Sequence, residues 1–147
     1  MNTPVQHLDT TMSVFKFPGD LKYVKEASHK VLDFLSDLKL NAGVVFDIKL
    51  CFEEAFINAV KYGNKGDSRL TVDVEVIKHG DSIELVVRDH GEGFEFKKTS
   101  DPRQDENLLK TSGRGVFLII SLMDKVVYEK NGSCLRMIKN IKRREGL

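Results

Sequence analysis

The most informative segment of the chain is Glu53-Glu54-Ala55-Phe56-Ile57-Asn58-Ala59-Val60-Lys61-Tyr62-Gly63. It completes the most apolar helical segment of the chain, which is expected to run from about Ala42 to Tyr62 and to stop at Gly63. A helix that is apolar on most faces should be largely buried, so its polar members need a reason. Glu54 and Asn58 are four residues apart, and a helix places them on one face about one turn apart.

The rest of the chain predicts an α+β two-layer sandwich, with a mainly antiparallel mixed sheet and helices packed on one face. Alternation and helical spacing predict strands over 12–17, 70–76, 83–88, 126–129 and 134–138, and helices from the Asp20 cap to Leu38 and over 115–123. Residues 1–10 are expected to form a loose N-terminal leader, and residues 11–147 a single domain. The polar, irregular segment 94–112 is longer than most connections, which predicts a functional or disordered loop.

The composition is that of an ordinary soluble domain. The chain has 147 residues, 41% hydrophobic and 31% charged, and its net charge of +1 gives no support to non-specific nucleic-acid binding. Cys51 and Cys134 are far apart and share no ligand spacing with histidine, which argues against a disulfide framework and a zinc site. Without a signal-peptide pattern or a membrane-spanning apolar stretch, the expectation is a cytoplasmic protein with no membrane contact.

Glu54 and Asn58 can be interpreted chemically in two ways. The Asn58 carboxamide oxygen is a hard ligand that suits Mg²⁺, and Glu54 beside it could orient or deprotonate a hydroxyl or a water next to a terminal phosphate. The alternative is that both side chains cap buried backbone groups or form surface pairs. For an isolated E-x-x-x-N pattern on a helix, this second interpretation is favoured.

Asp89 stands at the end of an expected strand and is followed by Gly91 and Gly93. Its carboxylate could accept a hydrogen bond from the exocyclic amine of adenine, whereas guanine presents a carbonyl at that position and would leave polar groups unpaired. The two glycines would let the backbone lie against the base. An ordinary Asp-x-Gly turn is the alternative, and it is favoured when the motif is taken alone.

A third segment, Gly113-Arg114-Gly115, precedes an apolar helix. The free amides at a helix N-terminus attract anions, and Arg114 could add a phosphate contact. A hinge before a core helix is the alternative. Lys97 and Lys61 are weaker phosphate candidates. The chain lacks a P-loop, a kinase catalytic loop and the third glycine of a dinucleotide fingerprint, which excludes these nucleotide sites.

Taken in order, three patterns resemble the N, G1 and G2 boxes of the GHKL ATP-binding superfamily. They are E-E-A-x-x-N-A-x-x-Y-G, D-x-G-x-G-F and G-x-G-V-x-L-I-x-x-L-M-D. The layout from Met12 to Ile141 is most similar to that of the bacterial anti-sigma factor serine/threonine-protein kinases. The resemblance implies a Bergerat-type ATP-binding fold.

The resemblance also implies roles for residues at the matching positions. Glu54 would be the general base, Asn58 would hold Mg²⁺, and Asp89 would bind the adenine of ATP. Segment 96–112 would form a lid over the nucleotide. The remaining nucleotide-binding positions would be Gly91 and Gly93 beneath the base, Lys97, and Gly113, Arg114, Gly115 and Val116 along the phosphates.

The implied function is that of an ATP-binding regulator which phosphorylates a serine or threonine of an anti-anti-sigma-type partner. A sigma factor would be the competing partner, and the kinase would form a homodimer through its sheet. Two alternatives stay open at this point. One is a non-catalytic module that uses ATP to sequester a partner, and the other is a free-standing histidine-kinase-type ATPase domain.

Overall fold

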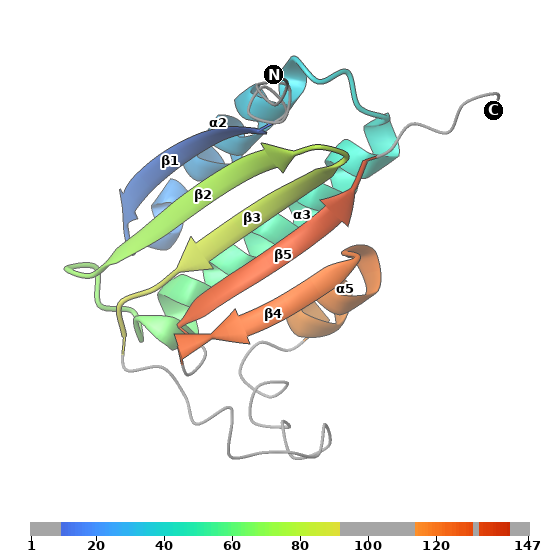
Figure 1. Ribbon diagram of the computed structural model, residues 1–147. Coiled ribbons are helices and arrows are strands. Elements are labelled where there is room, and N and C mark those ends of the chain that lie inside the picture. The colour runs from blue at the N-terminus through green and yellow to red at the C-terminus, as the bar shows by residue number, and fades with distance from the viewer. Residues whose placement is uncertain (1–9, 92–113, 131–132, 142–147) are drawn as a thin grey trace, which may run out of the picture.

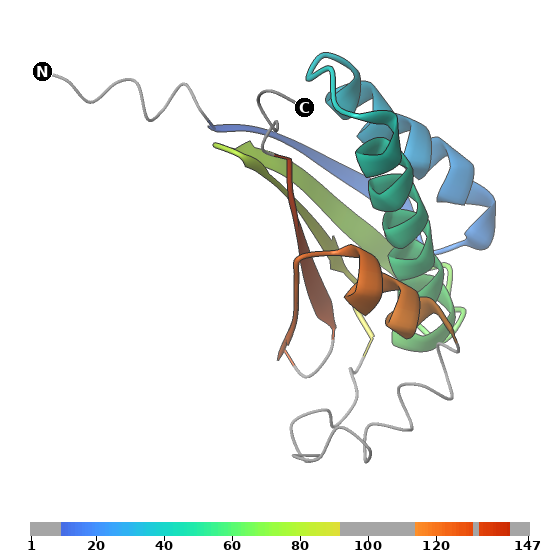
Figure 2. The same cartoon turned by 90° about the vertical axis from the view of Figure 1, so that its right-hand side faces the viewer.

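The computed structural model describes residues 10–91, 114–130 and 133–141. In this part of the chain a sheet forms one layer and the helices form the other, all on the same face of the sheet (Figures 1 and 2). The elements in chain order are β1 (Thr10–Pro18), η1 (Leu21–Tyr23), α2 (Val24–Ser36), α3 (Ala42–Asn58), η2 (Ala59–Gly63), β2 (Thr71–His79), β3 (Ser82–Arg88), α5 (Arg114–Leu122), β4 (Lys125–Glu129) and β5 (Cys134–Asn140). The predicted α+β sandwich is thereby confirmed.

The sheet has five strands in the order β1-β2-β3-β5-β4, and every pair of neighbours is antiparallel. Its register follows the alternation in the sequence, because Val74 lies opposite Val87 and Leu85 lies opposite Met137. All four of these side chains point to the helical face, since paired residues in an antiparallel sheet share a face. The strand β1 begins at Thr10, a residue that the sequence placed in the leader.

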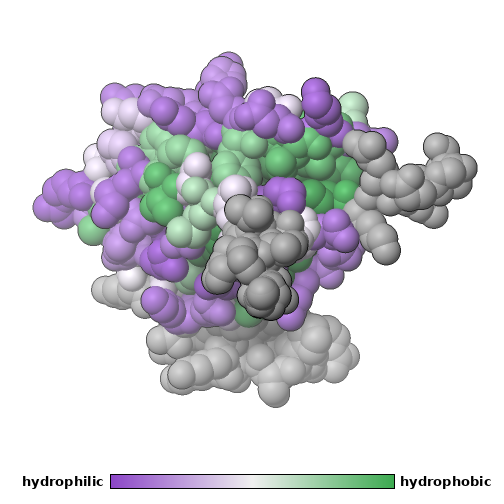
Figure 3. Space-filling view, turned by 45° about the horizontal axis from the view of Figure 1, so that its top comes forward, coloured by the Kyte–Doolittle hydropathy of each residue, from purple (hydrophilic) through white to green (hydrophobic). Residues whose placement is uncertain are grey.

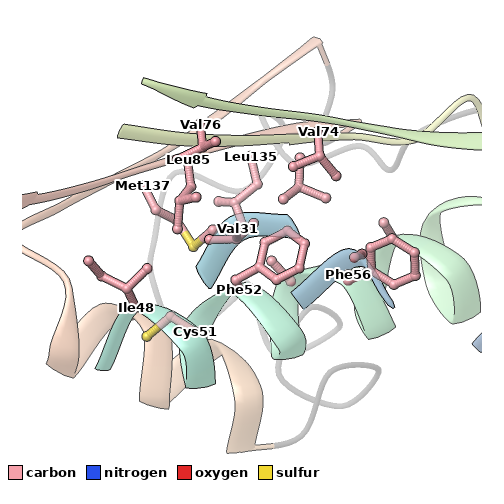
Figure 4. Packing of buried hydrophobic residues seen from close by; sticks show 14 of the residues in the cluster. Val31, Ile48, Cys51, Phe52, Phe56, Val74, Val76, Leu85, Leu135 and Met137 are labelled. Carbon is pink, nitrogen blue, oxygen red and sulfur yellow. The ribbon is translucent and has the colours of Figure 1, made fainter. Parts of the chain in front are cut away.

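The core lies between α3 and the inner face of the sheet. Phe52 and Phe56 of α3 are fully buried, as predicted for the apolar helix, and they face valines and leucines of the strands (Figure 4). Cys51 is buried beside them, which confirms the predicted free thiol in the core. Burying one large apolar side chain contributes about 1.5–3 kcal/mol, so this layer fixes the orientation of α3 against the sheet.

The helices begin at side-chain caps. The Asp20 carboxylate accepts a hydrogen bond from the backbone N–H of Lys22 at 3.0 Å, so the predicted cap is confirmed, although the first turn is a 3₁₀ turn. The Asn41 carboxamide accepts from the N–H of Gly43 at 2.7 Å and starts α3. Both caps satisfy backbone donors that the first helical turn leaves without partners.

The apolar helix is not α-helical to its end. After Asn58 the α-helix widens into a π turn, η2, in which the N–H of Asn64 donates to the carbonyl of Ala59 at 2.8 Å. The helical segment ends at Gly63 as predicted. However, Gly63 has no positive φ, unlike Gly66 and Gly80, so a left-handed cap is not the reason for a glycine here. Single π turns are often found at functional sites.

The remaining sequence-based expectations fall partly outside the described residues. Residues 1–9 of the expected leader and the whole of the expected loop 94–112 lie outside the described residues. No helix in the described part of the chain is both long enough and apolar enough to span a bilayer.

Candidate functional site

Two predicted groups on α3 meet the start of α5. A Cβ atom added to Gly115 would lie 2.5 Å from Oε1 of Glu54 and 3.5 Å from Nδ2 of Asn58. The first turn of α5 therefore lies against the carboxylate and the carboxamide, and a larger residue at 115 would displace the end of the Glu54 side chain. Figure 2 shows α5 beside α3, and this arrangement brings residues that are far apart in the sequence into contact.

The side chains of Glu54 and Asn58 are half-buried, and neither makes a hydrogen bond or an ion pair within the described residues. By contrast, the neighbouring Glu53 forms an ion pair with Lys49, with a distance of 3.1 Å between Nζ and Oε2. The alternative in which Glu54 and Asn58 cap backbone groups or form surface pairs thus finds no support in this part of the chain. Within the described residues, the polar atoms of both side chains are therefore unpaired.

Asp89 follows β3 and is buried, with 7% of its surface exposed. Its backbone N–H donates to the carbonyl of Ser133 at 2.8 Å, which attaches the strand end to the start of β5. The Asp89 Oδ1 atom accepts from the N–H of Gly91 at 3.0 Å, so the Asp-x-Gly turn is present. Oδ2 accepts no hydrogen bond from any described residue and lies against the backbone of Gly63.

Burial raises the pKa of the Asp89 carboxyl from 3.8 to about 6, because desolvation disfavours the charged form. The hydrogen bond from Gly91 and the nearby His90 oppose this rise. A buried carboxyl group with a strongly raised pKa is a common mark of a functional site.

Two glycines allow the helix end and the strand end to touch. A Cβ on Gly63 would lie 2.1 Å from Oδ2 of Asp89, and a Cβ on Gly91 would lie 1.7 Å from the carbonyl oxygen of Gly63. The glycine at position 91 is explained in the sequence analysis by close approach of the backbone to a ligand. The structure supplies a second reason, which is close packing of Gly91 against the backbone of the π turn.

Asn64 is a site residue that the sequence analysis missed. It is 2% exposed, its Nδ2 donates to the carbonyl of Thr71 at 3.0 Å, and its Oδ1 accepts from the N–H of His90 at 2.8 Å. An asparagine after a glycine is common in ordinary turns, so the sequence offered only a weak signal. Asn64 is buried because the π turn places it beside the start of β2 and the residue after β3.

The other predicted residues divide into two groups. Val116 lies in the first turn of α5 with 2% of its surface exposed, so it packs into the molecule beside the site. Arg114 is the first residue of α5. Gly93, Lys97 and Gly113 lie outside the described residues, and their predicted roles stay predictions.

The donor set fits a magnesium ion that is shared with phosphates. Within the described ranges no group of three or more His, Cys, Asp or Glu side chains could hold a metal by itself. Mg²⁺ in nucleotide sites typically uses one or two protein oxygens together with phosphate oxygens and waters. The free Asn58 carboxamide, next to Glu54 and the first amides of α5, meets that requirement.

Comparison with known proteins identifies sequence relatives along most of the chain. Residues 17–139 match the family described as the histidine kinase-like ATPase domain. A protein named serine-protein kinase RsbW from Staphylococcus epidermidis is 33% identical over 138 residues, which span 88% of this chain and 87% of the relative. The protein of the same name from Staphylococcus aureus strain JH9 is 34% identical over 125 residues, with 76% and 77% of the two chains covered.

A solved structure has the same fold. The RsbU and RsbW domains of Rv1364c from Mycobacterium tuberculosis superpose with a TM-score of 0.64 over 91% of this chain, at 14% sequence identity. This chain spans 33% of that longer chain. The likeness concerns the fold alone.

Proposed function

The chain belongs to the histidine kinase-like ATPase domain family, and from this we infer that it is an ATP- and Mg²⁺-dependent serine/threonine kinase acting on a partner protein. Its relatives carry the name serine-protein kinase. The observation that carries the proposal is the approach of Gly115 to Glu54 and Asn58, because it brings a helix N-terminus, a carboxylate and a carboxamide to one place. Those are the parts that phosphoryl transfer needs.

In the proposed complex, ATP lies between α3 and the ends of β3 and β5. The Asp89 Oδ2 atom would accept a hydrogen bond from the adenine amine, and Asn58 would be the protein ligand of Mg²⁺. When bound, Mg²⁺ would neutralise charge on the transferred phosphoryl group. The backbone amides at the start of α5 would donate to phosphate oxygens, as helix N-termini commonly do. Segment 96–112, which includes Lys97, is proposed as the lid, with Gly93 and Gly113 at or beside its two ends.

The proposed transfer step uses Glu54 as the general base. The hydroxyl oxygen of a partner serine or threonine would form a bond to the γ-phosphorus, and the bond from that phosphorus to the β,γ-bridging oxygen would break. The hydroxyl proton would pass to the Glu54 carboxylate, and ADP would leave. Because Glu54 is free of other partners among the described residues, its position is compatible with this role.

The partner proposed as the substrate is a small anti-anti-sigma-type protein, and a sigma factor is proposed as the competing partner. No direct contact with nucleic acid or a membrane belongs to the proposal. We place the protein in the cytoplasm, where such partners would be encountered.

A homodimer through the sheet is also proposed. Met12 and Val14 lie on the outer face of the edge strand β1, and they are 57% and 59% exposed. Figure 3, which views the sheet side obliquely, shows hydrophobic residues gathered in patches among hydrophilic ones. Exposed apolar groups on a sheet edge favour association with another surface.

The kinase proposal can be tested by capture followed by a transfer assay. Proteins from the native cell that bind the tagged chain would be identified by mass spectrometry, purified, and incubated with γ-labelled ATP and Mg²⁺. Label on a serine or threonine of a captured protein is expected. Nucleotide-dependent capture without any label would instead indicate the binding module, and acid-labile label on histidine would indicate the histidine-kinase type.

A further inference from the structure

Asn64 connects three parts of the chain that meet where β2 begins and β3 ends. It follows the π turn η2, its carboxamide nitrogen donates to Thr71 at the start of β2, and its carboxamide oxygen accepts from His90 just after β3. The orientation of the carboxamide is fixed by chemistry, because a carbonyl needs a donor and an N–H needs an acceptor. A buried side chain with both ends satisfied in this way is costly to replace.

Glycines surround Asn64 on several sides. A Cβ on Gly19 would lie 2.8 Å from the Asn64 Nδ2, and a Cβ on Gly91 would lie 3.4 Å from the Asn64 Cα. Gly63 precedes it and contacts Asp89. The backbones of Gly19 and Gly91 therefore pack closely against Asn64, and its carboxamide oxygen is bonded to the residue that follows Asp89.

We propose that Asn64 is a positioning residue that sets the nucleobase selectivity of the site by holding the Asp89-His90-Gly91 segment in place. The proposal rests on the proposed ATP-binding function. Asp89 is attached at its own N–H to Ser133 and at its carboxylate to Gly91. Asn64 supplies the attachment of the next peptide, at His90, to the helical layer.

The consequence for recognition follows from hydrogen-bond geometry. A carboxylate distinguishes an amine from a carbonyl only when its oxygen is held within hydrogen-bond distance and direction of that group. Without the Asn64 oxygen, the N–H of His90 loses its partner, and the backbone after β3 can shift away from the π turn although the His90 ring stays paired with Asp73 of β2 at 2.8 Å. Asp89 would then still be present, but it would reject the wrong base less strongly.

The test compares ATP with inosine triphosphate, which carries a carbonyl in place of the adenine amine. Calorimetry with Mg²⁺ at pH 8, where the Asp89 carboxyl is ionised, would give the ratio of the two dissociation constants. Asn64→Ala removes both hydrogen bonds, and Asn64→Asp keeps an oxygen for the N–H of His90. Val31→Ala, at a buried position of α2, serves as a control that destabilises the fold away from the site.

The wild type is expected to prefer ATP by about fivefold or more, which corresponds to one unpaired buried polar group. Asn64→Ala should bring the ratio close to one, whereas Asn64→Asp and Val31→Ala should keep it within about twofold of the wild type. Should Asn64→Ala fail to fold, Asn64→Ser replaces it with the same expected ratio, since a serine hydroxyl is too short to reach both partners.

An unchanged ratio in Asn64→Ala together with a lowered melting temperature would overturn the proposal, because Asn64 would then be purely structural. The loss of selectivity in Val31→Ala would overturn it too. A wild type without any preference for ATP would refute both the Asp89 contact and the role of Asn64. Absence of phosphoryl transfer with intact ATP selectivity would refute only the kinase function.

Discussion

The carboxylate of Asp89 occupies the space in which a side chain at Gly63 would begin. A Cβ on Gly63 would lie 2.1 Å from Oδ2 and 2.9 Å from the Cβ of Asp89. Gly63, the last residue of the helical segment, therefore packs directly against the side chain of Asp89, the first residue after β3. The contact links the layer that carries Glu54 and Asn58 to the strand end that carries the proposed adenine ligand.

Substitution of Gly63 should show how much depends on this contact. Gly63→Ala is expected to destabilise the fold by about 1–3 kcal/mol, as overpacking typically does, and to weaken ATP binding because Asp89 must move. Denaturant unfolding and calorimetry would measure the two effects. Gly43→Ala is the matched control at the opposite end of α3, where the added Cβ would lie 3.1 Å from the Asn41 Oδ1. Equal ATP affinities for both variants would contradict the expectation.

Glu54→Gln should separate binding from transfer. The variant is expected to bind ATP within about threefold of the wild type and to lose phosphoryl transfer by about 10²–10⁴-fold, the usual contribution of a general base. A transfer assay with the captured partner measures this loss. Glu53→Gln is the matched control, because Glu53 pairs with Lys49 and not with the site. Normal transfer by Glu54→Gln would exclude the base assignment.

Asp89→Asn should weaken ATP binding by about 5–150-fold at pH 8, because an amide cannot replace a carboxylate as an acceptor without presenting a donor as well.

Wild-type affinity should also rise as the pH is raised through about 6, where the Asp89 carboxyl loses its proton. Titrations from pH 5 to 8 would show this dependence in the wild type. A parallel dependence in Asp89→Asn would assign the effect to another group.

The stability of the nucleotide-free protein should fall with rising pH, opposite to the predicted rise in ATP affinity. Since burial raises the pKa of Asp89 from 3.8 to about 6, the native state holds this proton more tightly than the unfolded state. The contribution of Asp89 to stability is therefore greatest below pH 4 and falls by about 2–3 kcal/mol as the pH rises to 6 and above. Urea unfolding of the wild type and Asp89→Asn across this range should reveal that difference between the two proteins.

The proposed homodimer predicts an effect of charge on β1. Val14→Lys places a cation among the exposed apolar groups of the outer sheet face, and it should shift the protein from dimer to monomer at micromolar concentration. Light scattering after gel filtration would report the mass. Phe46→Lys is the control, since Phe46 is 59% exposed but belongs to α3 on the other layer. A dimer that persists in Val14→Lys would place the interface elsewhere.

Much of the fold could be predicted from the sequence because the patterns are local and strong. The alternation around Val74 and the helical spacing around Val31 each indicate which face is buried, the apolar character around Phe52 indicates a buried helix, and the Asp20 cap marks a helix start. The family resemblance implies that Glu54 and the start of α5 lie around one nucleotide, but it does not specify their direct contact. The residues alone did not reveal it, because the two segments are far apart in the chain.

The parts that escaped prediction depend on non-local packing. The burial of Asn64 requires the π turn, and no periodicity in Ala59-Val60-Lys61-Tyr62-Gly63 distinguishes a π turn from an α turn. The reason for Gly91 also depends on a distant residue, since the obstacle to a side chain there is the carbonyl of Gly63. Sequence patterns identify such positions as turns, but only the packed structure shows which atoms a side chain at the turn would clash with.

The π turn also makes chain length critical at this point. An α-helix advances about 100° per residue, so deleting one residue between Ala59 and Gly63 and restoring the α geometry would rotate everything that follows by that amount. Asn64 would then point away from Thr71 and His90, even though every remaining residue kept its identity. Relatives that lack this extra residue should therefore secure the end of β3 by a different side chain, and an alignment gap at this position would mark them.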